Sequence, residues 1–163
     1  SQLVWTMRSR NGVEDGLSQL GAQAGVPLGL DQDGCCAIVL DDGLNVVVEA
    51  DEARGLAHLH ADLLRVGRAR RLELFERAMA LNLFCAGTEG ATLGLDGGSD
   101  ALVLYLGRPL DGLTGNDLAG LVGEFVGLAR RLRDELQQSD ADTPELEAEI
   151  LDHARARDFR FIA

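Results

Sequence analysis

Apolar residues recur along the chain with two spacings, and these predict an alternation of helices and strands. The first helical spacing covers residues 11–25, with Asn11 as the cap and Glu14 as its capping-box partner. Gly25 and Pro27 are expected to end this helix. Its apolar stripe consists of Val13, Leu17, Leu20 and Ala24.

Short runs rich in strand-forming residues then predict three strands, at residues 35–40, 44–49 and 56–64. The Asp-Gly step at residues 42–43 predicts a hairpin between the first two runs. The third run also fits a helical spacing. We favour a strand there, because Gly67 breaks the chain before a better helix begins.

That second helix is predicted over residues 68–82 and carries apolar residues on an unusually wide surface. One stripe consists of Leu72, Phe75 and Met79, and the other of Leu74, Ala78 and Leu81. A surface this wide indicates burial on two sides. One side is expected to cover a sheet, and a second subunit is the simplest cover for the other.

Two further strands are predicted at residues 91–96 and 101–107. The second is apolar on both faces, which is typical of a central strand or a subunit contact. Thr114, with Asp117 as capping-box partner, is expected to begin a long amphipathic helix that reaches Leu136. Close approach by a neighbour and a coding bias towards glycine explain the glycines of this helix equally well; they are Gly120, Gly123 and Gly127.

The two ends of the chain differ from this body. Residues 1–10 are expected to be an N-terminal extension that includes vector-derived residues, because Ser1 is not a translation start. Residues 11–138 form the predicted domain, and residues 139–163 an acidic C-terminal helix and tail. Six acids and no cation lie between Ser139 and Asp152. A helix is expected over residues 140–157, and the apolar residues 159–162 are expected to dock on the body or on a partner.

Composition mainly excludes functions. Of the 163 residues, 46% are hydrophobic and 26% charged, and the net charge is −12. All 15 cations are Arg, which excludes lysine-dependent phosphate loops and Schiff-base chemistry. The negative charge argues against a nucleic-acid partner. No apolar run is long enough to insert into a membrane, no signal peptide is recognisable, and the three cysteines indicate a reduced, cytoplasmic protein.

The candidate chemistry is sparse. His58, His60 and Asp62 share one face of the third strand and resemble the start of a hydrolase metal motif. The following Leu63 breaks that motif, only His153 remains as a further histidine, and a plain polar strand face is the alternative interpretation. Nothing in the sequence gives Cys35, Cys36 or Cys85 a catalytic base. We therefore expect no enzyme, no catalytic residue, no metal and no cofactor.

The order helix, three strands, helix, two strands, helix resembles the class I type III secretion chaperones of the Tir-chaperone (CesT-like) family. The resemblance covers roughly residues 13–136. It is carried by residues 25–30 (Gly-Val-Pro-Leu-Gly-Leu), the strand at 36–41, the helix at 72–83, and residues 92–96 and 106–113 before the last helix. Asn82 stands where the family has a recurrent Asn. The resemblance implies an α+β fold with a twisted antiparallel sheet and a homodimer.

The resemblance also implies a function. Such chaperones bind the N-terminal segment of a secreted effector in extended form, often as an added strand, and use no ATP. The implied effector contacts are Leu17, Leu20, Val26, Leu28, Ile38, Val46 and Val48. The implied dimer contacts are Leu74, Leu81, Leu93, Leu102 and Leu104. A core role is the competing interpretation for about half of the effector set.

Three alternatives stay open at this point. The chain could be a regulatory or adaptor protein of the same fold, similar to YbjN. It could be a small metal hydrolase using His58, His60 and Asp62. The acidic tail could bind a secretion ATPase or a regulator.

Overall fold

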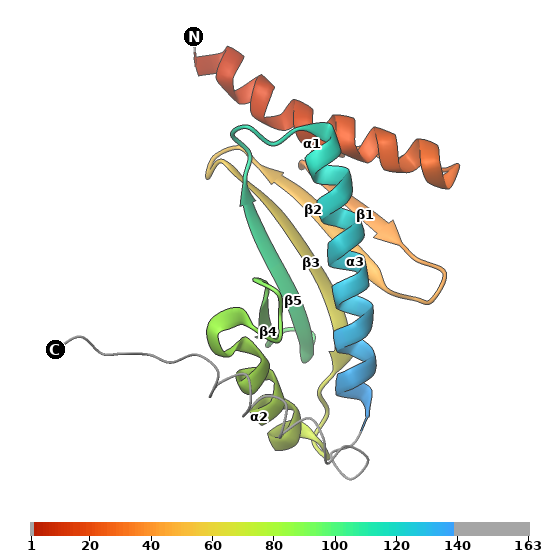
Figure 1. Cartoon of the computed structure of the whole chain (residues 1–163), viewed down its shortest axis with the longest axis vertical. Helices are drawn as coiled ribbons and strands as arrows, with labels where there is room; N and C mark the ends of the chain where they lie inside the picture. The colour runs from red at the N-terminus through yellow and green to blue at the C-terminus, as the bar shows by residue number, and fades with distance from the viewer. Residues whose placement is uncertain (1, 139–163) are drawn as a thin grey trace, which may run out of the picture.

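The computed structural model describes residues 2–138, with side chains from residue 10 onward, and has the predicted α+β architecture. Three α-helices and one five-stranded antiparallel sheet make up this part of the chain. Figure 1 shows α3 along one face of the sheet, with α1 crossing its first turns and α2 beside its last turn. The elements are α1 (Gln2–Ala24), β1 (Cys35–Val39), β2 (Asn45–Asp51), β3 (Leu56–Arg65), α2 (Arg71–Asn82), the 3₁₀ turn η1 (Leu83–Cys85), β4 (Thr92–Asp96), β5 (Ala101–Pro109) and α3 (Gly115–Gln137).

The strand order is β1-β2-β3-β5-β4, and every neighbouring pair is antiparallel. The predicted hairpin is confirmed, since β1 pairs with β2 and the Leu40 N–H donates to the Leu44 carbonyl at 2.9 Å. The ambiguous run at residues 56–64 is a strand, as favoured. The doubly apolar strand β5 is central, because it lies between β3 and β4. β1 and β4 are therefore the two edges of the sheet.

The two faces of the sheet differ as the alternation of apolar and polar residues requires. On the helix-covered face, Val46 and Val48 of β2 lie beside Leu59 and Ala61 of β3 and are buried. On the opposite face the same two strands carry Val47, Glu49, His58, His60 and Asp62. The face with α3 is thus the side of the hydrophobic core. No helix among residues 2–138 covers the other face, which we call the open face.

Both ends of α3 are capped by side chains. The Asp117 N–H donates to the Thr114 hydroxyl and the Thr114 N–H to the Asp117 carboxylate, each at 3.1 Å, which confirms the predicted capping box. At the other end Arg70 and Arg77 donate to the last carbonyls of the helix, those of Glu135, Leu136 and Gln137, and of Gln138 beyond it. Helix ends leave such carbonyls without partners inside the helix, so α2 holds the end of α3 in place.

Glycines allow α1 and α3 to cross closely. A Cβ atom on Gly12 would overlap the Leu113 carbonyl oxygen, and one on Gly16 would lie 2.7 Å from Leu118 Cβ. By contrast, apart from the nearby backbone of α3 itself, no described atom lies within 4 Å of a Cβ placed on Gly120, Gly123 or Gly127. Close packing against the described residues therefore does not explain the three α3 glycines, and the close approach occurs at Gly12 and Gly16 instead.

Two helix starts differ from the prediction. α1 begins at Gln2, so Asn11 lies inside the helix and does not cap it. The reason is that residues 2–10 contain neither Gly nor Pro, and nothing stops the helix from extending towards the N-terminus. α2 begins at Arg71 because Gly67, with φ of 61°, and the turn after it delay the helix. The helix predicted over 140–157 and the docking of 159–162 lie outside the described residues.

Candidate functional site

The predicted effector contacts divide into buried and accessible residues. Leu17, Val46 and Val48 have no exposed surface, so they are core residues of this chain. Leu20, Leu28 and Ile38 are half-buried, and Val26 is 50% exposed. Leu20 lies near the end of α1, Val26 and Leu28 lie in the loop after it, and Ile38 lies on β1. We call this accessible set the β1 surface.

The loop of the β1 surface is fixed on both sides. The Val26 N–H donates to the Gly21 carbonyl at 3.0 Å, and Gly21 lies close to Leu28 because a Cβ there would be 3.4 Å from Leu28 Cβ. On the other side, the Gly29 backbone bonds the Cys36 thiol, and the Asp31 N–H donates to the Cys35 carbonyl at 2.8 Å. The loop therefore lies between α1 and β1 and presents its apolar side chains next to the edge of the sheet.

An ionic contact ties the β1–β2 hairpin to α3. The Asp42 carboxylate accepts hydrogen bonds from Arg130 Nε at 2.7 Å and from Arg133 Nη2 at 2.9 Å. The Arg130 bond is the largest cause that lowers the pKa of Asp42 to about 2, followed by the bond from the Leu44 N–H. At neutral pH this carboxylate is charged and holds the tip of the hairpin against the helix.

Asn82 closes part of the opposite edge of the sheet. Its amide nitrogen donates to the Leu93 carbonyl at 2.8 Å, and its amide oxygen accepts from the Leu93 N–H, also at 2.8 Å. The side chain thus bonds β4 as a neighbouring strand would. The sequence marked this residue only through the resemblance to the CesT-like family and gave no sign of this role.

The five predicted dimer contacts, Leu74, Leu81, Leu93, Leu102 and Leu104, are all buried within the single chain. The two apolar stripes of α2 are present as predicted, but the stripe with Leu74, Ala78 and Leu81 faces the core. In the other stripe Leu72 is 71% and Met79 is 74% exposed, whereas Phe75 is half-buried and packs against the core. Leu83 and Phe84 continue it beyond the helix. We call Leu72, Met79, Leu83 and Phe84 the α2 surface.

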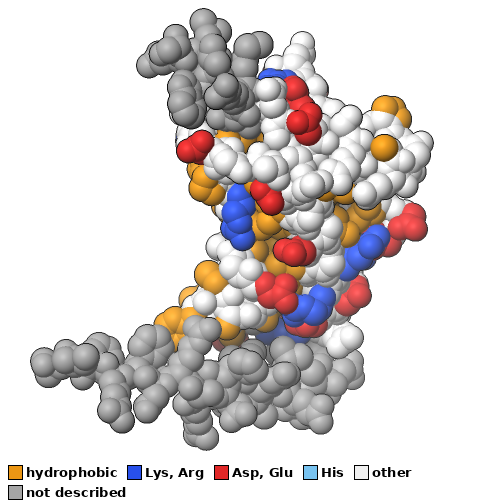
Figure 2. Space-filling view, turned by 45° about the horizontal axis from the view of Figure 1, so that its top comes forward, with side chains coloured by type: hydrophobic (Ala, Val, Ile, Leu, Met, Phe, Trp, Pro, Cys, Tyr) orange, Lys and Arg blue, Asp and Glu red, His pale blue; other side chains and the backbone are white. Residues whose placement is uncertain are grey.

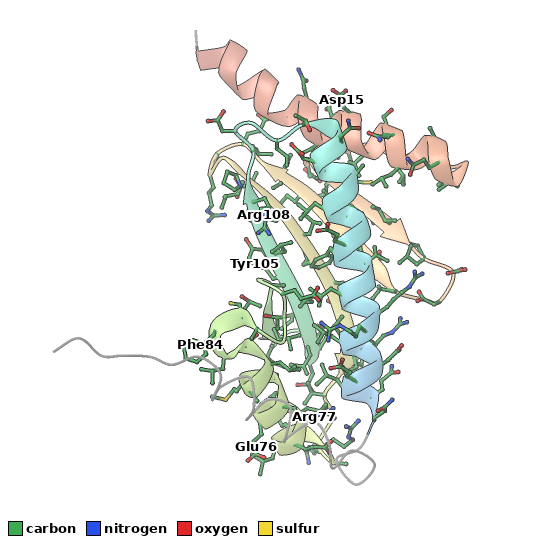
Figure 3. All side chains as sticks on the ribbon, viewed as in Figure 1. Asp15, Glu76, Arg77, Phe84, Tyr105 and Arg108 are labelled. Atoms are coloured by element: carbon green, nitrogen blue, oxygen red, sulfur yellow. The ribbon has the colours of Figure 1, made fainter. Side chains whose placement is uncertain are left out.

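The end of the α2 surface has a strained backbone. Phe84 and Cys85 have φ values of 57° and 54°, in the left-handed region that side chains other than glycine rarely adopt. Figure 3 shows Phe84 pointing away from the body of the molecule. Figure 2 shows apolar side chains on the outside at the end of the molecule that carries α2. The chain therefore accepts strain at a place where it presents an aromatic side chain.

His58, His60 and Asp62 lie on the open face of the sheet, and His58 forms a hydrogen-bonded cluster there with Tyr105 and Asp51. His58 Nδ1 lies 2.7 Å from the Tyr105 hydroxyl, and His58 Nε2 lies 3.0 Å from Asp51 Oδ2. The bond with His58 and one from the Arg54 N–H lower the pKa of Asp51. Both ring nitrogens of His58 are thus engaged by protein groups. Within residues 2–138, no group of three or more His, Cys, Asp or Glu side chains is placed to hold a metal ion; His153 lies outside that range.

The cysteines do not form an activated thiol site. All three are unpaired, with Cys36 buried and Cys35 half-buried. Burial raises the pKa of both the Cys35 and the Cys36 thiols, and nearby carboxylates raise that of Cys35 further. A raised pKa disfavours the thiolate, which is the nucleophilic form.

Comparison with known proteins places this arrangement in a family. The sequence profile of the Tir chaperone protein (CesT) family matches residues 16–133. No curated protein sequence is significantly similar to the chain. Among the described helices, none is long and apolar enough to cross a membrane.

Several solved structures have the same fold. A chain of the HopA1–SchA chaperone–effector complex is 23% identical with a TM-score of 0.60, and the match covers 77% of this chain and 96% of that one. A chain of the ExsC–ExsE complex is 20% identical with a TM-score of 0.61, covering 76% and 92%. A chain of the heterodimeric ExoU–SpcU complex from the type III secretion system of Pseudomonas aeruginosa is 20% identical with a TM-score of 0.57, covering 76% and 93%.

Proposed function

Because the chain belongs to the Tir chaperone protein (CesT) family, we propose that it is a type III secretion chaperone. It binds the N-terminal segment of a secreted effector in extended form, in the cytoplasm and without ATP, and keeps that segment soluble until export. The family match over residues 16–133 carries this proposal. Two of the structures with this fold are described as a chaperone–effector complex and as part of a type III secretion system, which supports it. We propose no enzymatic activity, in line with a family of chaperones.

The accessible apolar residues suit this role. We propose that the β1 surface contacts apolar side chains of the effector segment, with Leu20, Val26, Leu28 and Ile38 as the contacts that remain from the predicted set. Unoccupied apolar surfaces promote aggregation. The net charge of −12 opposes aggregation through repulsion between molecules.

We further propose that the protein is a homodimer whose contact is the α2 surface. Leu72 and Met79 are more than 70% exposed. Several large apolar side chains exposed close together usually mark an interaction site. Met79→Glu is expected to give a folded monomer by light scattering. Val39→Glu is the matched control, since Val39 is also 74% exposed but lies on β1, and it should leave the mass unchanged. A Met79→Glu variant that keeps the mass of a dimer would refute this contact.

Coexpression tests the chaperone function. The chain is coexpressed with N-terminal fragments of secreted proteins encoded nearby, and the complexes are separated by size-exclusion chromatography. We expect one fragment to remain soluble only with the chain and to coelute with it. If no fragment shifts the elution of the chain, the chaperone proposal fails and the YbjN-like regulatory or adaptor role takes its place.

The other two alternatives need different observations. A metal hydrolase using His58, His60 and Asp62 would require stoichiometric metal in the purified protein, which a His60→Ala variant would lose. Binding of a secretion ATPase by residues 139–163 would require capture of the ATPase by the full chain but not by a chain that ends at Gln138.

A further inference from the structure

The α2 surface has positive charge next to its apolar side chains. Residues 65–77 contain five Arg and two Glu, although the whole chain has a net charge of −12. Arg68 is exposed in the turn before α2. The Arg71 side chain at the start of the helix is 41% exposed, although it bonds Asp100 at 2.7 Å. The α2 surface therefore fits a partner that combines apolar side chains with carboxylates.

The apolar part of this surface faces away from the core. Leu72 and Met79 are seven residues apart, so they project from the same side of α2. That side lies about half a turn round the helix from the buried Leu74 and Leu81. A partner can thus cover Leu72 and Met79 without disturbing the core.

The sequence of the chain contains a segment with the matching chemistry. Residues 139–152, which we call the acidic segment, include six acids and no cation. Leu146 and Ile150 of this segment are four residues apart, a spacing that places two side chains on one face of a helix. The acidic segment therefore offers both the carboxylates and the apolar pair that the α2 surface fits.

The end of α3 brings the chain close enough for this contact. Arg70 and Arg77 donate to the Gln138 carbonyl at 2.8 and 2.7 Å, so the last described residue lies against α2. Half the circumference of a helix about 10 Å wide is about 16 Å. The eight residues from Gln138 to Leu146 can span about 26 Å when extended, which is enough to reach the far side of α2.

We propose that the acidic segment covers the α2 surface of its own chain and competes there with the second copy. Its carboxylates pair with Arg68 and Arg71, and its apolar side chains cover Leu72 and Met79. This inference rests on the proposed homodimer and adds a control to it. Each copy takes part in the dimer only while its own acidic segment is released.

The competition has a calculable effect on the Kd of the dimer. The apparent affinity of a protein falls in proportion to the fraction that is competent to bind. If the acidic segment covers the α2 surface for about two-thirds of the time, about one-third of the copies are competent. Both copies must be competent at once, so the dimer Kd rises about ninefold. The acidic segment thus sets the concentration at which the chain dimerises.

A change inside the acidic segment tests the competition without altering the charge. The full chain with Leu146→Ser and Ile150→Ser is compared with wild type by sedimentation equilibrium. We expect the dimer Kd to fall at least about threefold, because the acidic segment is released and more copies are competent. Apolar side chains that took part in the dimer would raise the Kd when removed. A Kd that is unchanged or raised would therefore overturn the inference.

A pair of charge reversals tests where the acidic segment binds. Arg68→Glu changes the α2 side, and Arg108→Glu is the matched control, because Arg108 is also exposed but lies near the far end of β5 (Figure 3). Both variants lower the net charge by two, so general repulsion affects both dimers equally. We expect the dimer Kd of Arg68→Glu to be at least about threefold lower than that of Arg108→Glu. The difference should vanish in about 1 M NaCl, where charges are screened within about 3 Å.

Combining the variants shows whether Arg68 acts through the acidic segment. In a chain that already carries Leu146→Ser and Ile150→Ser, Arg68→Glu and Arg108→Glu should give the same dimer Kd. A difference that persists there means that Arg68 acts on the dimer directly, which would overturn the inference.

The effector fragment separates this inference from the proposed function. If the variants leave the dimer Kd unchanged while the fragment still coelutes with the chain, the competition is refuted and the chaperone function stands. A chain that stays monomeric at every concentration, even with Leu146→Ser and Ile150→Ser, would overturn the inference and the homodimer together.

Discussion

Replacing Asn82 tests whether one side chain holds the β4 edge. The Asn82 amide makes two hydrogen bonds of 2.8 Å to the backbone of Leu93, and Asn82→Ala removes both. A hydrogen bond contributes about 0.5–1.5 kcal/mol net, so the expected loss of unfolding free energy is about 1–3 kcal/mol. Asn82 is half-buried, so water can replace part of the lost hydrogen bonding. We therefore expect a loss of unfolding free energy of about 2 kcal/mol.

Urea denaturation followed by circular dichroism measures this loss. All chains are compared at one protein concentration, because a dimer makes the apparent stability depend on concentration. Asn45→Ala is the control, since Asn45 is exposed on β2 and should change the free energy by less than about 0.5 kcal/mol. If Asn82→Ala costs no more than Asn45→Ala, the two bonds do not stabilise the fold and the closure of the β4 edge loses its support.

Asn82→Asp separates the two bonds. A carboxylate still accepts from the Leu93 N–H, but it faces the Leu93 carbonyl with a second acceptor. The folded state therefore favours the protonated carboxyl, which donates to that carbonyl, and the pKa of the new group is raised by folding. The deficit of this variant relative to wild type should be full at pH 7 and shrink as the pH falls through the raised pKa. A deficit that does not depend on pH would contradict this geometry.

Three further predictions follow from packing, charge and capping. Gly12→Ala should cost about 1–3 kcal/mol, because the new methyl group overlaps the Leu113 carbonyl, whereas Gly120→Ala should stabilise α3 by up to about 1 kcal/mol, since space is open there; urea denaturation compares them. Arg130 lowers the pKa of Asp42 to about 2, so the contribution of Asp42 to stability is present above the unfolded pKa of about 4 and is lost as the pH falls through 2; the difference in urea midpoint between wild type and Asp42→Asn should shrink steadily over that range, and a difference as large at pH 2 as at pH 7 would refute it. Thr114→Ala should cost about 1 kcal/mol of unfolding free energy through loss of the cap of α3, while Thr92→Ala, on an exposed position of β4, should cost less.

Local signals in the sequence predicted most elements of the fold. The Asp-Gly step at residues 42–43 and the capping box of Thr114 each act within a few residues, and both are confirmed. The predicted start of α1 was wrong, because Asn11 can cap a helix only if the helix begins there. That depends on the residues before it, which continue the helix.

Local signals in the sequence did not show which apolar residues lie on the surface and which lie in the core. Both stripes of α2 are apolar, and only the tertiary structure shows that Leu74, Ala78 and Leu81 are buried in the core while Leu72 and Met79 are exposed. The role of Asn82 likewise depends on a strand that begins ten residues later and returns beside it. Buried Val46 and Val48 have the same residue type as the exposed Val39, so only the side of the strand that each occupies tells them apart.

The bonds from Arg70 and Arg77 to the end of α3 join parts of the chain that are far apart in the sequence. The two side chains bond carbonyl groups that lie 58 to 68 residues further along the chain. We therefore expect α2 and the last turn of α3 to open together, as one cooperative unit.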